Sequence, residues 1–329
     1  MRQVVAERAG GPEVLGVVEA PTPEAGAGEV VIAAEAVGVN FADVWARLGV
    51  EGEPPFRPGI EVAGTVAAVG PEITWPAVGD RVAATPYGAG GAYAELVRAP
   101  AELCFPVPDG MPAATAAALP LNYLTAYAAV EHAARPRAGE RVLVHAGAGG
   151  VGLAAVQLAR RHGVELYATA SPGKHEVLRA EGVAHPLGYA DWVAEVGRLS
   201  GEGVDVVVDG VGQDQFASSL SVLRFGGRVV AYGYTAGVTS ETDADRDLEK
   251  TLSAGVPLYD LLSEARGIIG VHMGAPSATL RRWWDHLLEL YAAGTIAPLV
   301  TTLPLADAAE AHRRLHARET VGKLSLIHM

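Results

Sequence analysis

The spacing of hydrophobic residues changes after the first hundred residues of the chain. Up to that point, short apolar runs such as "GEVVIAAEAVGVN" alternate with breaks rich in Gly and Pro, which is typical of a small β-barrel or sandwich. From "AATAAALPLNYLTAYAAV" onward, apolar residues recur at helical intervals between β-branched runs such as "RVLVHA" and "VDVVVDGV". These runs are apolar on both faces, which predicts a buried parallel sheet with helices between its strands.

A last helical segment, "SATLRRWWDHLLELYAAG", leads into a tail with the pattern of strand, helix and strand. We assign this tail to the first domain. The expected organisation is therefore one domain made of residues 1–112 and 294–329, and a second made of residues 113–293.

Composition narrows the class of protein. A chain of 329 residues, half of them hydrophobic, is long enough for two domains with separate cores. Its formal net charge of −13 argues against a nucleic acid as the partner. The single cysteine, Cys104, excludes a disulfide framework and a thiolate zinc site within one chain. No apolar stretch has the length of a secretory signal or a membrane span, so we expect a soluble cytoplasmic protein.

The stretch "VLVHAGAGGVGLAAVQLARRHG" contains a G-x-G-x-x-G pattern formed by Gly147, Gly149 and Gly152. The pattern is weak alone, but here it lies between a strand and a helix. In that context the first glycine permits the turn, the second lets the backbone approach a diphosphate, and the third packs helix on strand. We interpret the stretch as a dinucleotide-binding loop rather than a bare turn.

The end of the next strand, "YATASPGKHE", indicates which dinucleotide is bound. An acidic residue there would hydrogen-bond the ribose 2′-hydroxyl of NAD. This chain has Ala170 and Ser171 instead, followed by Lys174, so a 2′-phosphate meets a hydroxyl and an ammonium group. The pattern favours NADPH, with the alternative that Lys174 is simply a solvated residue at a helix start.

Seven motifs occur in order along the chain: "GGPEVL", "GVNFADV", "PGIEVAGTVAAVG", "GDRV", "GGAYAEL", "HAGAGGVGLAAVQLA" and "VGKLSLI". In these motifs the chain resembles the zinc-independent quinone oxidoreductase family of the medium-chain dehydrogenase/reductase superfamily. The resemblance implies an α/β fold, in which a Rossmann doubly wound parallel sheet is joined to a GroES-like β-barrel domain. It also implies a cleft between the domains and hydride transfer from a nicotinamide.

The resemblance further implies a 2′-phosphate site built from Lys174, Tyr189 and Arg318. Taken alone, Tyr189 is more often an ordinary packing residue, and Arg318 an ordinary surface arginine. Together with the loop, the expected cofactor-binding residues are Thr125, Gly147, Gly149, Gly150, Val151, Gly152, Ser171, Lys174, Tyr189, Gly233, Tyr234 and Arg318.

Zinc is not expected. In zinc-dependent relatives, a cysteine, a His-Glu pair and a second cysteine ligate the catalytic metal, and the matching positions here hold Asn40, Ile60 and Leu121. An amide and two butyl groups do not form the N/S tetrahedron that zinc prefers. The histidines show no ligand spacing, and His145 is interpreted as a strand-end residue beside the glycine loop.

Without a metal, hydrogen-bond donors or solvent must stabilise the negative charge that develops on a carbonyl oxygen. The expected catalytic residues are Asn40, Trp45 and Tyr123. The Asn40 amide is the first candidate donor, against the alternative of a turn residue. Asp43 is expected to hold the Asn40 loop. Trp45 stands where related quinone reductases often have tyrosine, and Tyr123 has the alternative of a helix-packing residue.

The leading hypothesis is an NADPH-dependent, zinc-free reductase that passes hydride to a quinone or an α,β-unsaturated carbonyl. The alternatives are an enoyl-thioester or alkenal reductase, and a nonenzymatic NADPH-binding sensor or structural protein. The strand "GIIGVH", residues 267–272, predicts a homodimer because an apolar edge strand is normally covered. The acidic stretch 236–266 is interpreted as either a lid or an exposed decoration.

Overall fold

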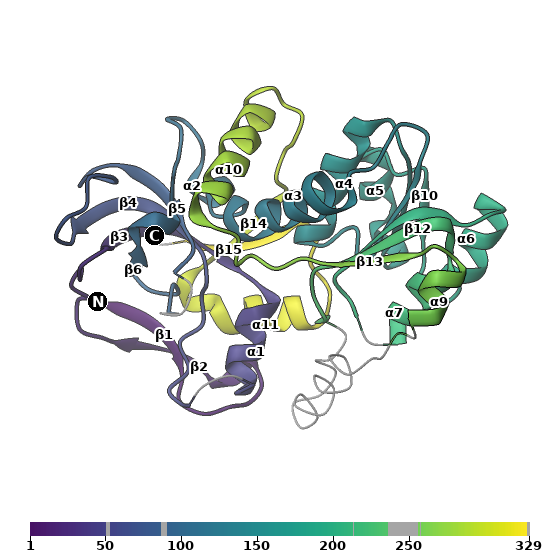
Figure 1. Cartoon of the computed structure of the whole chain (residues 1–329). Helices are drawn as coiled ribbons and strands as arrows, with labels where there is room; N and C mark the ends of the chain where they lie inside the picture. Colours follow the sequence, from purple (N-terminus) through teal and green to yellow (C-terminus); the bar gives the residue numbers. More distant parts are fainter. Residues whose placement is uncertain (51–52, 87–90, 213, 236–255, 257, 328–329) are drawn as a thin grey trace. The chain divides into compact units, whose positions relative to one another are not determined.

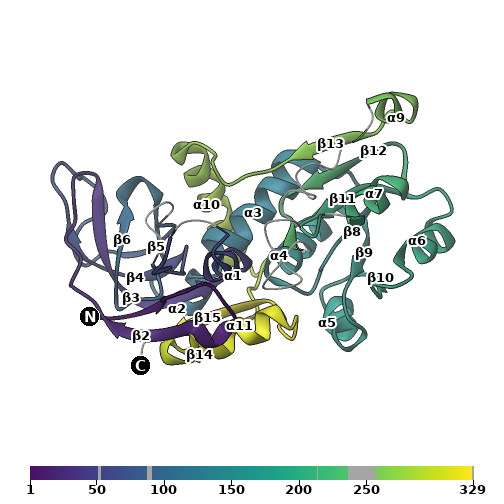
Figure 2. The ribbon, with the colours of Figure 1, turned by 90° about the horizontal axis from the view of Figure 1, so that it is seen from below.

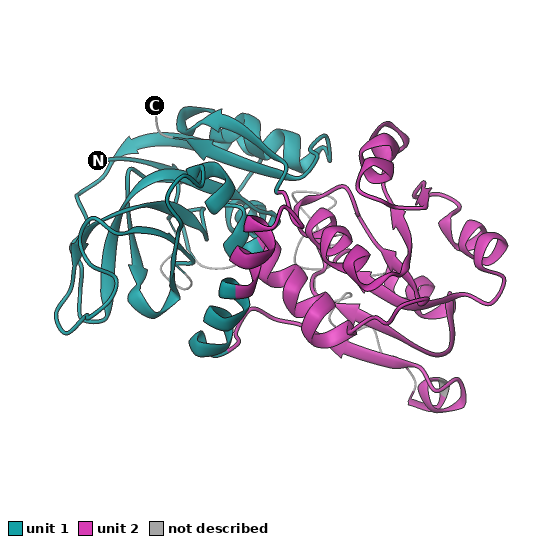
Figure 3. Ribbon diagram, turned by 90° about the horizontal axis from the view of Figure 1, so that it is seen from above, with its two compact units in different colours: residues 1–121, 276–285, 298–329 teal, residues 122–275, 286–297 magenta. Residues whose placement is uncertain are grey.

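The structure is a computed structural model of the chain, and it describes all residues except 51–52, 87–90, 213, 236–255, 257 and 328–329 (Figure 1). The described residues form two compact units (Figure 3). Unit 1 contains residues 1–121, 276–285 and 298–329, and unit 2 contains residues 122–275 and 286–297. Most of the expected lid segment, 236–266, lies outside the described residues.

Unit 1 is built mainly from antiparallel strands. A seven-stranded sheet has the order β14-β15-β3-β4-β5-β7, with β6 paired to β3, and β1 and β2 form a separate pair. The strands are β1 (Arg2–Ala6), β2 (Leu15–Glu19), β3 (Glu29–Val39), β4 (Val62–Val69), β5 (Arg81–Ala84), β6 (Leu96–Pro100), β7 (Cys104–Pro106), β14 (Val300–Pro304) and β15 (Lys323–Ile327). Their inward-facing residues form one apolar core that includes Val30, Ile32, Val66 and Leu326.

The helices that lie wholly within unit 1 are short, and each one follows a strand in the chain. They are α1 (Phe41–Leu48), α2 (Ala113–Ala116) and α11 (Ala308–His316), with 3₁₀ turns at η1 (Pro12–Val14), η2 (Ala101–Leu103) and η8 (Leu305–Asp307). Strand β15 pairs antiparallel with β3, with Ser325 opposite Gly38. This register brings the start of β15 beside the end of β3, where α1 begins.

The described residues of unit 2 contain a six-stranded sheet in the order β10-β9-β8-β11-β12-β13, and Figure 2 shows the strands in this order. All the pairings between these described strands are parallel. The strands are β8 (Arg141–Val144), β9 (Glu165–Thr169), β10 (His185–Leu187), β11 (Val204–Asp209), β12 (Leu223–Ala231) and β13 (Gly267–Gly270). All six residues of β11 are buried, as expected for a central parallel strand covered on both faces.

In the described part of unit 2, helices precede β8 and connect the parallel strands. They are α3 (Leu124–Tyr127), α4 (Gly150–Ala159), α5 (His175–Ala180), α6 (Trp192–Ser200), α7 (Asp214–Ser221) and α9 (Leu258–Ser263), with 3₁₀ turns η5 (Arg160–His162) and η6 (Pro172–Lys174). π-Helical turns η3 (Leu119–Tyr123) and η4 (Ala128–Ala134) flank α3. Because the sheet is parallel, the carboxyl ends of its strands lie along one edge, where ligands of open α/β sheets bind.

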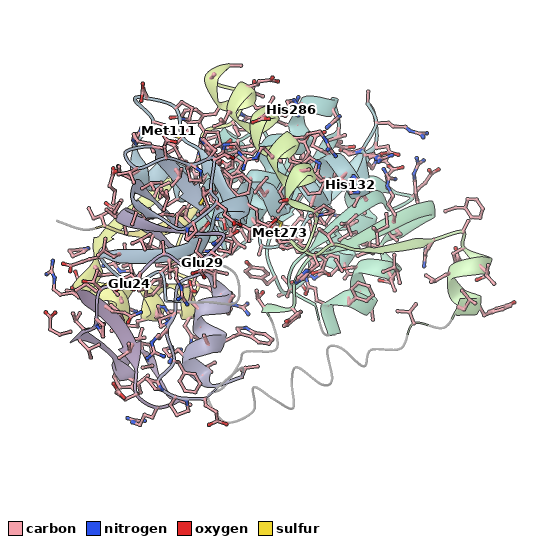
Figure 4. The ribbon with its side chains drawn as sticks, turned by 60° about the vertical axis from the view of Figure 1, so that its left-hand side comes forward. Glu24, Glu29, Met111, His132, Met273 and His286 are labelled. Carbon is pink, nitrogen blue, oxygen red and sulfur yellow. The ribbon has the colours of Figure 1, made fainter. Side chains whose placement is uncertain are left out.

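Helix α10 (Ser277–Ala292) is divided between the two units. In its first part the Trp284 ring stacks on Phe105 with centroids 4.9 Å apart, and its Nε1 donates to the Pro106 carbonyl at 2.9 Å. In its second part Nδ1 of His286, a residue labelled in Figure 4, lies 2.8 Å from the Tyr127 hydroxyl. The sequence predicted domain boundaries at 112/113 and 293/294, whereas the structure divides the chain at 121/122, 275/276, 285/286 and 297/298. The contacts with β7 explain why residues 276–285 group with unit 1.

Candidate active site

The glycine loop connects β8 to α4 at the carboxyl edge of the parallel sheet. Its backbone is tied to the neighbouring strand because Gly147 N donates to the Thr169 carbonyl at 2.9 Å. Ala146 has a φ of 48°, a left-handed conformation that is uncommon for a residue with a side chain. Helix α4 begins at Gly150 with Gly149 as its N-cap, so its first backbone N–H groups lie at the loop. A helix N-terminus of this kind is suited to binding a diphosphate.

Two glycines of the G-x-G-x-x-G pattern are required by close packing. A Cβ at Gly152 would lie 2.2 Å from the Ala146 carbonyl oxygen, and a Cβ at Gly147 would lie 2.7 Å from the Ala168 Cβ. At Gly149 the nearest atom would be 3.2 Å away, which is tight but not prohibitive. Gly147 therefore lets the loop approach β9, and Gly152 lets α4 approach the loop, while Gly149 lies at the N-cap that would face an anion. Val151 follows in the first turn of α4.

Asn122 was not identified from the sequence and lies against the start of α4. The contact is close, because a Cβ at Gly150 would lie only 2.0 Å from Asn122 Nδ2 and would move this side chain. Three residues further along the chain, Thr125 is buried in α3. Tyr123 is also buried, and its hydroxyl donates to Gln157 Oε1 at 2.7 Å. This bond engages the Tyr123 hydroxyl within unit 2, in keeping with the packing alternative.

The ends of β9 and β10 bring three of the expected phosphate-site residues to one edge. The strands are hydrogen-bonded neighbours, and Ala170 N donates to the Leu187 carbonyl at 2.9 Å just beyond them. Ser171 and Lys174 follow β9, and Tyr189 follows β10 with 42% of its surface exposed. The position of the expected carboxylate is occupied by the buried Ala170. Arg318 belongs to unit 1, where it follows α11 with a φ of 55°, and its part in the phosphate site stays a prediction.

The residues that follow β11 and β12 are tightly packed against each other. Tyr232 follows β12, and its ring fills the space that a side chain at position 210 would need, because a Cβ at Gly210 would lie 2.3 Å from the nearest ring atom. Burial, followed by the nearby Asp209 charge, raises the pKa of Tyr232 well above its ordinary value, so this phenol is neutral. Gly233 and Tyr234 continue from it along the same edge. Their cofactor contacts stay predictions.

The buried side chain of His145 supports the glycine loop through hydrogen bonds. His145 Nδ1 lies 3.1 Å from Thr169 Oγ1, and its Nε2 lies 3.1 Å from Ser219 Oγ. Thr169 Oγ1 also accepts the Ala146 N–H at 3.1 Å, which links the histidine to the loop backbone. Burial lowers the pKa of His145, so the ring is neutral and acts as a structural bridge. This position agrees with its interpretation as a strand-end residue.

In unit 1, Asp43 organises the start of α1. Its carboxylate accepts Asn40 N at 2.7 Å, Gly59 N at 2.9 Å and the Tyr93 hydroxyl at 3.1 Å. Burial raises the pKa of Asp43 to about 6, although the two backbone bonds oppose that effect. Asp43 therefore holds the Asn40 loop, the role expected for it. Trp45, within the same helix α1, is largely buried with 9% of its surface exposed.

The Asn40 side chain is held by a buried ion pair that the sequence did not reveal. Asn40 Nδ2 donates to Glu61 Oε1 at 2.8 Å, and Lys323 Nζ donates to Asn40 Oδ1. Lys323 also forms a salt bridge with Glu61, whose second oxygen accepts Leu121 N at 2.9 Å. Both charged side chains are almost completely buried. The one available sequence signal was the scarcity of lysine, which occurs only at positions 174, 250 and 323.

Two stretches of the chain match known families of protein domains. Residues 26–109 match the alcohol dehydrogenase GroES-like domain, and residues 150–291 match the zinc-binding dehydrogenase domain. The synaptic vesicle membrane protein VAT-1 homolog of Rattus norvegicus is 36% identical over 317 residues, which cover 93% of this chain and 78% of that protein. The quinone oxidoreductase of Pseudomonas syringae pv. Tomato DC3000 is 34% identical with a TM-score of 0.88, and the match covers 99% of each chain.

The Escherichia coli quinone oxidoreductase, solved in complex with NADPH, is 29% identical with a TM-score of 0.88, and the match covers 99% of this chain and 100% of that one. The chain belongs to the zinc-independent quinone oxidoreductase family of medium-chain dehydrogenases/reductases. The expected fold class is confirmed, with a Rossmann-type parallel sheet and a GroES-like β domain.

Some members of this superfamily carry zinc, but the donor groups of this chain do not fit the metal. The three positions that match zinc ligands, Asn40, Ile60 and Leu121, surround Glu61, and the ammonium group of Lys323 lies directly beside the Glu61 carboxylate. A fixed cation and an amide do not make a zinc site. In the described part of the chain, no three His, Cys, Asp or Glu side chains are grouped so that they could hold a metal. No step of the chemistry is therefore assigned to zinc.

The name of the rat relative refers to a vesicle membrane protein. Among the described residues, no helix combines the length and the apolar character needed to cross a bilayer.

Proposed function

We propose that this quinone oxidoreductase family member is an NADPH-dependent reductase that transfers hydride to a quinone or an α,β-unsaturated carbonyl. The observation that carries the proposal is the edge formed by β8, β9 and β10. There the glycine loop adjoins a strand end without a carboxylate, and Ser171, Lys174 and Tyr189 follow the two outer strands. NADPH in the structure of the E. coli enzyme supports the same choice of nucleotide.

The residues of unit 2 fit this cofactor. The loop and the first N–H groups of α4 would hold the diphosphate, and Lys174 would pair with the 2′-phosphate in a charge-assisted hydrogen bond. When bound, NADPH supplies a hydride at nicotinamide C4. Arg318 is proposed as a second phosphate ligand, because a planar guanidinium suits phosphate oxygens.

In unit 1, Asn40 is proposed to act on the acceptor. Its Nδ2 donates one proton to Glu61 and carries a second, which we assign to the oxygen of the acceptor carbonyl. That hydrogen bond would strengthen as negative charge develops on the oxygen. A conjugated acceptor spreads this charge and needs less activation than a simple ketone, so a metal-free site is sufficient. Protonation of the reduced product from water completes the reaction.

We also propose that the protein is a homodimer in the cytoplasm. Strand β13 is the last of the described strands in the six-stranded sheet, so one of its edges has no partner within that set. Large apolar side chains are exposed nearby, early in β12 and on α9, and Gly226 N donates to the Glu264 carbonyl between them. They are Phe225, Leu258, Tyr259 and Leu262, each at least 69% exposed. A second copy would cover both features.

The same residues allow two alternative functions. An enoyl-thioester or alkenal reductase would use the same donor and cofactor residues with a larger acceptor. The second alternative is a nonenzymatic NADPH-binding protein, which would keep the cofactor residues without turnover of an acceptor.

The deciding experiment is steady-state oxidation of NADPH by the purified protein with matched quinones, enones, alkenals, enoyl thioesters and simple aldehydes. We expect turnover with quinones or enones and little with simple aldehydes. Preference for alkenals or enoyl thioesters would support the first alternative. Tight NADPH binding without turnover on any acceptor would support the second.

A further inference from the structure

The Asn40 amide can be turned in two ways, and only one of them serves the proposed reaction. An amide presents an oxygen acceptor on one side and an NH₂ donor on the other, and the two differ little in shape. If the oxygen faced the acceptor carbonyl, it would repel the developing negative charge. Some feature of the chain must therefore specify which side of the amide is presented.

We propose that the buried Glu61–Lys323 pair is a positioning device that fixes the orientation of the Asn40 amide. Glu61 Oε1, a group that only accepts when ionised, lies 2.8 Å from Asn40 Nδ2. Lys323 Nζ, a group that only donates, is bonded to Asn40 Oδ1. Turning the amide would place oxygen against carboxylate and NH₂ against ammonium. This inference rests on the proposed role of Asn40 in the reduction.

The surrounding structure keeps both charges in place. Glu61 Oε2 accepts Leu121 N at 2.9 Å, which anchors the carboxylate at its other oxygen. Gly38 supplies the space, because a Cβ there would lie 2.1 Å from Glu61 Oε1 and 2.6 Å from Lys323 Cε. The register of β15 against β3 places Gly38 opposite Ser325, two residues from Lys323. A side chain at position 38 would therefore displace the pair.

Stability alone is a poor explanation for this pair. Lys323 and Glu61 are 3% and 0% exposed, and transferring two charges out of water costs about as much as their attraction returns. Apolar residues of similar volume usually fill such a space equally well. A specific orientation of a neighbouring polar group is something that an apolar pair cannot provide.

The test uses a variant that removes both charges together, because deleting one partner leaves a buried charge uncompensated and can prevent folding. In Glu61→Gln/Lys323→Met, the glutamine can present either its oxygen or its NH₂ to Asn40, and methionine donates nothing. We expect the kcat of NADPH oxidation to fall roughly tenfold or more, as in Asn40→Ala, with the KM for NADPH unchanged. Adding Asn40→Ala to the double variant should then cost nothing further.

Val66→Ala is the matched control, because it makes a cavity in the apolar core of unit 1, and Val66 takes no part in the hydrogen bonds of the Asn40 side chain. It should lower the melting temperature and leave kcat unchanged well below that temperature. If the charge-free variant keeps the wild-type kcat, or if the loss multiplies with that of Asn40→Ala, the pair does not act through Asn40. If Asn40→Ala itself keeps full turnover, the inference fails while the reductase activity stands.

A second readout needs no acceptor and so separates this inference from the proposed function. The side-chain NH₂ signals of Asn40, assigned by their disappearance in Asn40→Ala, should show two distinct and protected protons in the NADPH-free protein. In Glu61→Gln/Lys323→Met they should shift and exchange faster with solvent. Signals that stay unchanged in this variant would overturn the positioning role, whether or not the wild-type protein reduces quinones.

Discussion

The hydroxyl of Tyr93 lies 3.1 Å from Nε2 of His312, and the two rings meet edge to face with centroids 5.7 Å apart. Burial lowers the pKa of His312 to about 3, with smaller contributions from the charges of Arg47 and His316. The imidazole is therefore neutral in the folded protein at neutral pH. Because Tyr93 also donates to Asp43, this contact links α11 to the loop that holds Asn40.

His312 should make unit 1 sensitive to acid. A histidine with a pKa of about 3 when folded and about 6.5 when unfolded binds protons preferentially in the unfolded chain between these values. Its stabilising contribution is complete above pH 6.5 and is lost as the pH falls through this window, up to about 3–5 kcal/mol. Thermal unfolding at pH 7.5 and pH 4.5 should therefore show a smaller pH-dependent loss in His312→Gln than in the wild type.

Asp43 changes the pH dependence of stability in the opposite direction to His312, so variants of both residues must be measured. Its folded pKa of about 6 exceeds the ordinary 3.8, and its contribution is therefore complete below 3.8 and lost as the pH rises through 6. Replacing Asp43 by Asn should steepen the loss of stability toward acid, although it also removes one backbone bond. Equal pH slopes for the wild type and His312→Gln would show that His312 does not govern the acid limb.

Asn40→Ala tests the donor assigned to the acceptor oxygen. We expect kcat to fall by roughly tenfold or more, because loss of an oxyanion donor typically costs a few kcal/mol, while NADPH affinity changes little. Asn40→Asp is the paired variant: it keeps the size of the side chain but places a carboxylate beside Glu61. Steady-state kinetics measures kcat and the KM for NADPH in both variants. Unchanged turnover of Asn40→Ala with every acceptor would leave Asn40 with only the role of a turn residue that precedes α1.

The groups around Glu61 predict that the protein does not bind zinc at this position. With an ammonium bonded to the carboxylate and to Asn40, elemental analysis of the purified protein should find well under one zinc per chain. Activity should survive prolonged exposure to a strong chelator. Stoichiometric zinc whose removal abolishes turnover would contradict the assignment of hydride transfer to a metal-free site.

The parts of the proposed site that the residue pattern predicted without any family resemblance are local in the chain. The glycine loop, Ser171 and Lys174 all lie between positions 147 and 174, and strand–turn–helix punctuation identifies them without any knowledge of the tertiary fold. The structure gives the reason for glycine at 147 and 152: a Cβ at these positions would clash with Ala168 and Ala146, respectively.

The parts that the sequence did not predict depend on register between distant strands. Lys323 is 283 residues from Asn40, and its approach requires β15 to pair with β3 so that Gly38 leaves room. Tyr93 and His312 are similarly far apart, at 219 residues. No local pattern marks a charge as buried, and a lysine at the start of a strand is normally solvated. Only the pairing of the strands reveals its partner.

The homodimer prediction can be tested at α9. Leu262→Asp and Tyr259→Asp place a charge on side chains that are 70% and 77% exposed beside the edge strand β13. We expect light scattering at micromolar concentration to give a dimeric mass for the wild type and a monomeric mass for Leu262→Asp. Val78→Asp, at a site in unit 1 that is 62% exposed, is the control and should remain dimeric. A monomeric wild type would refute the dimer.

Nucleotide choice tests Lys174 and Arg318 together. The 2′-phosphate carries nearly two negative charges, and each charge-assisted bond to it contributes on the order of 1.5–3 kcal/mol. After allowance for solvent screening, two such bonds give roughly 10²-fold preference for NADPH over NADH. Lys174→Ala and Arg318→Ala should each raise the KM for NADPH with little effect on NADH, and added salt should reduce the preference. Equal losses with both nucleotides would mean that neither residue contacts the phosphate, because only NADPH carries it; the glycine loop would still mark a dinucleotide site.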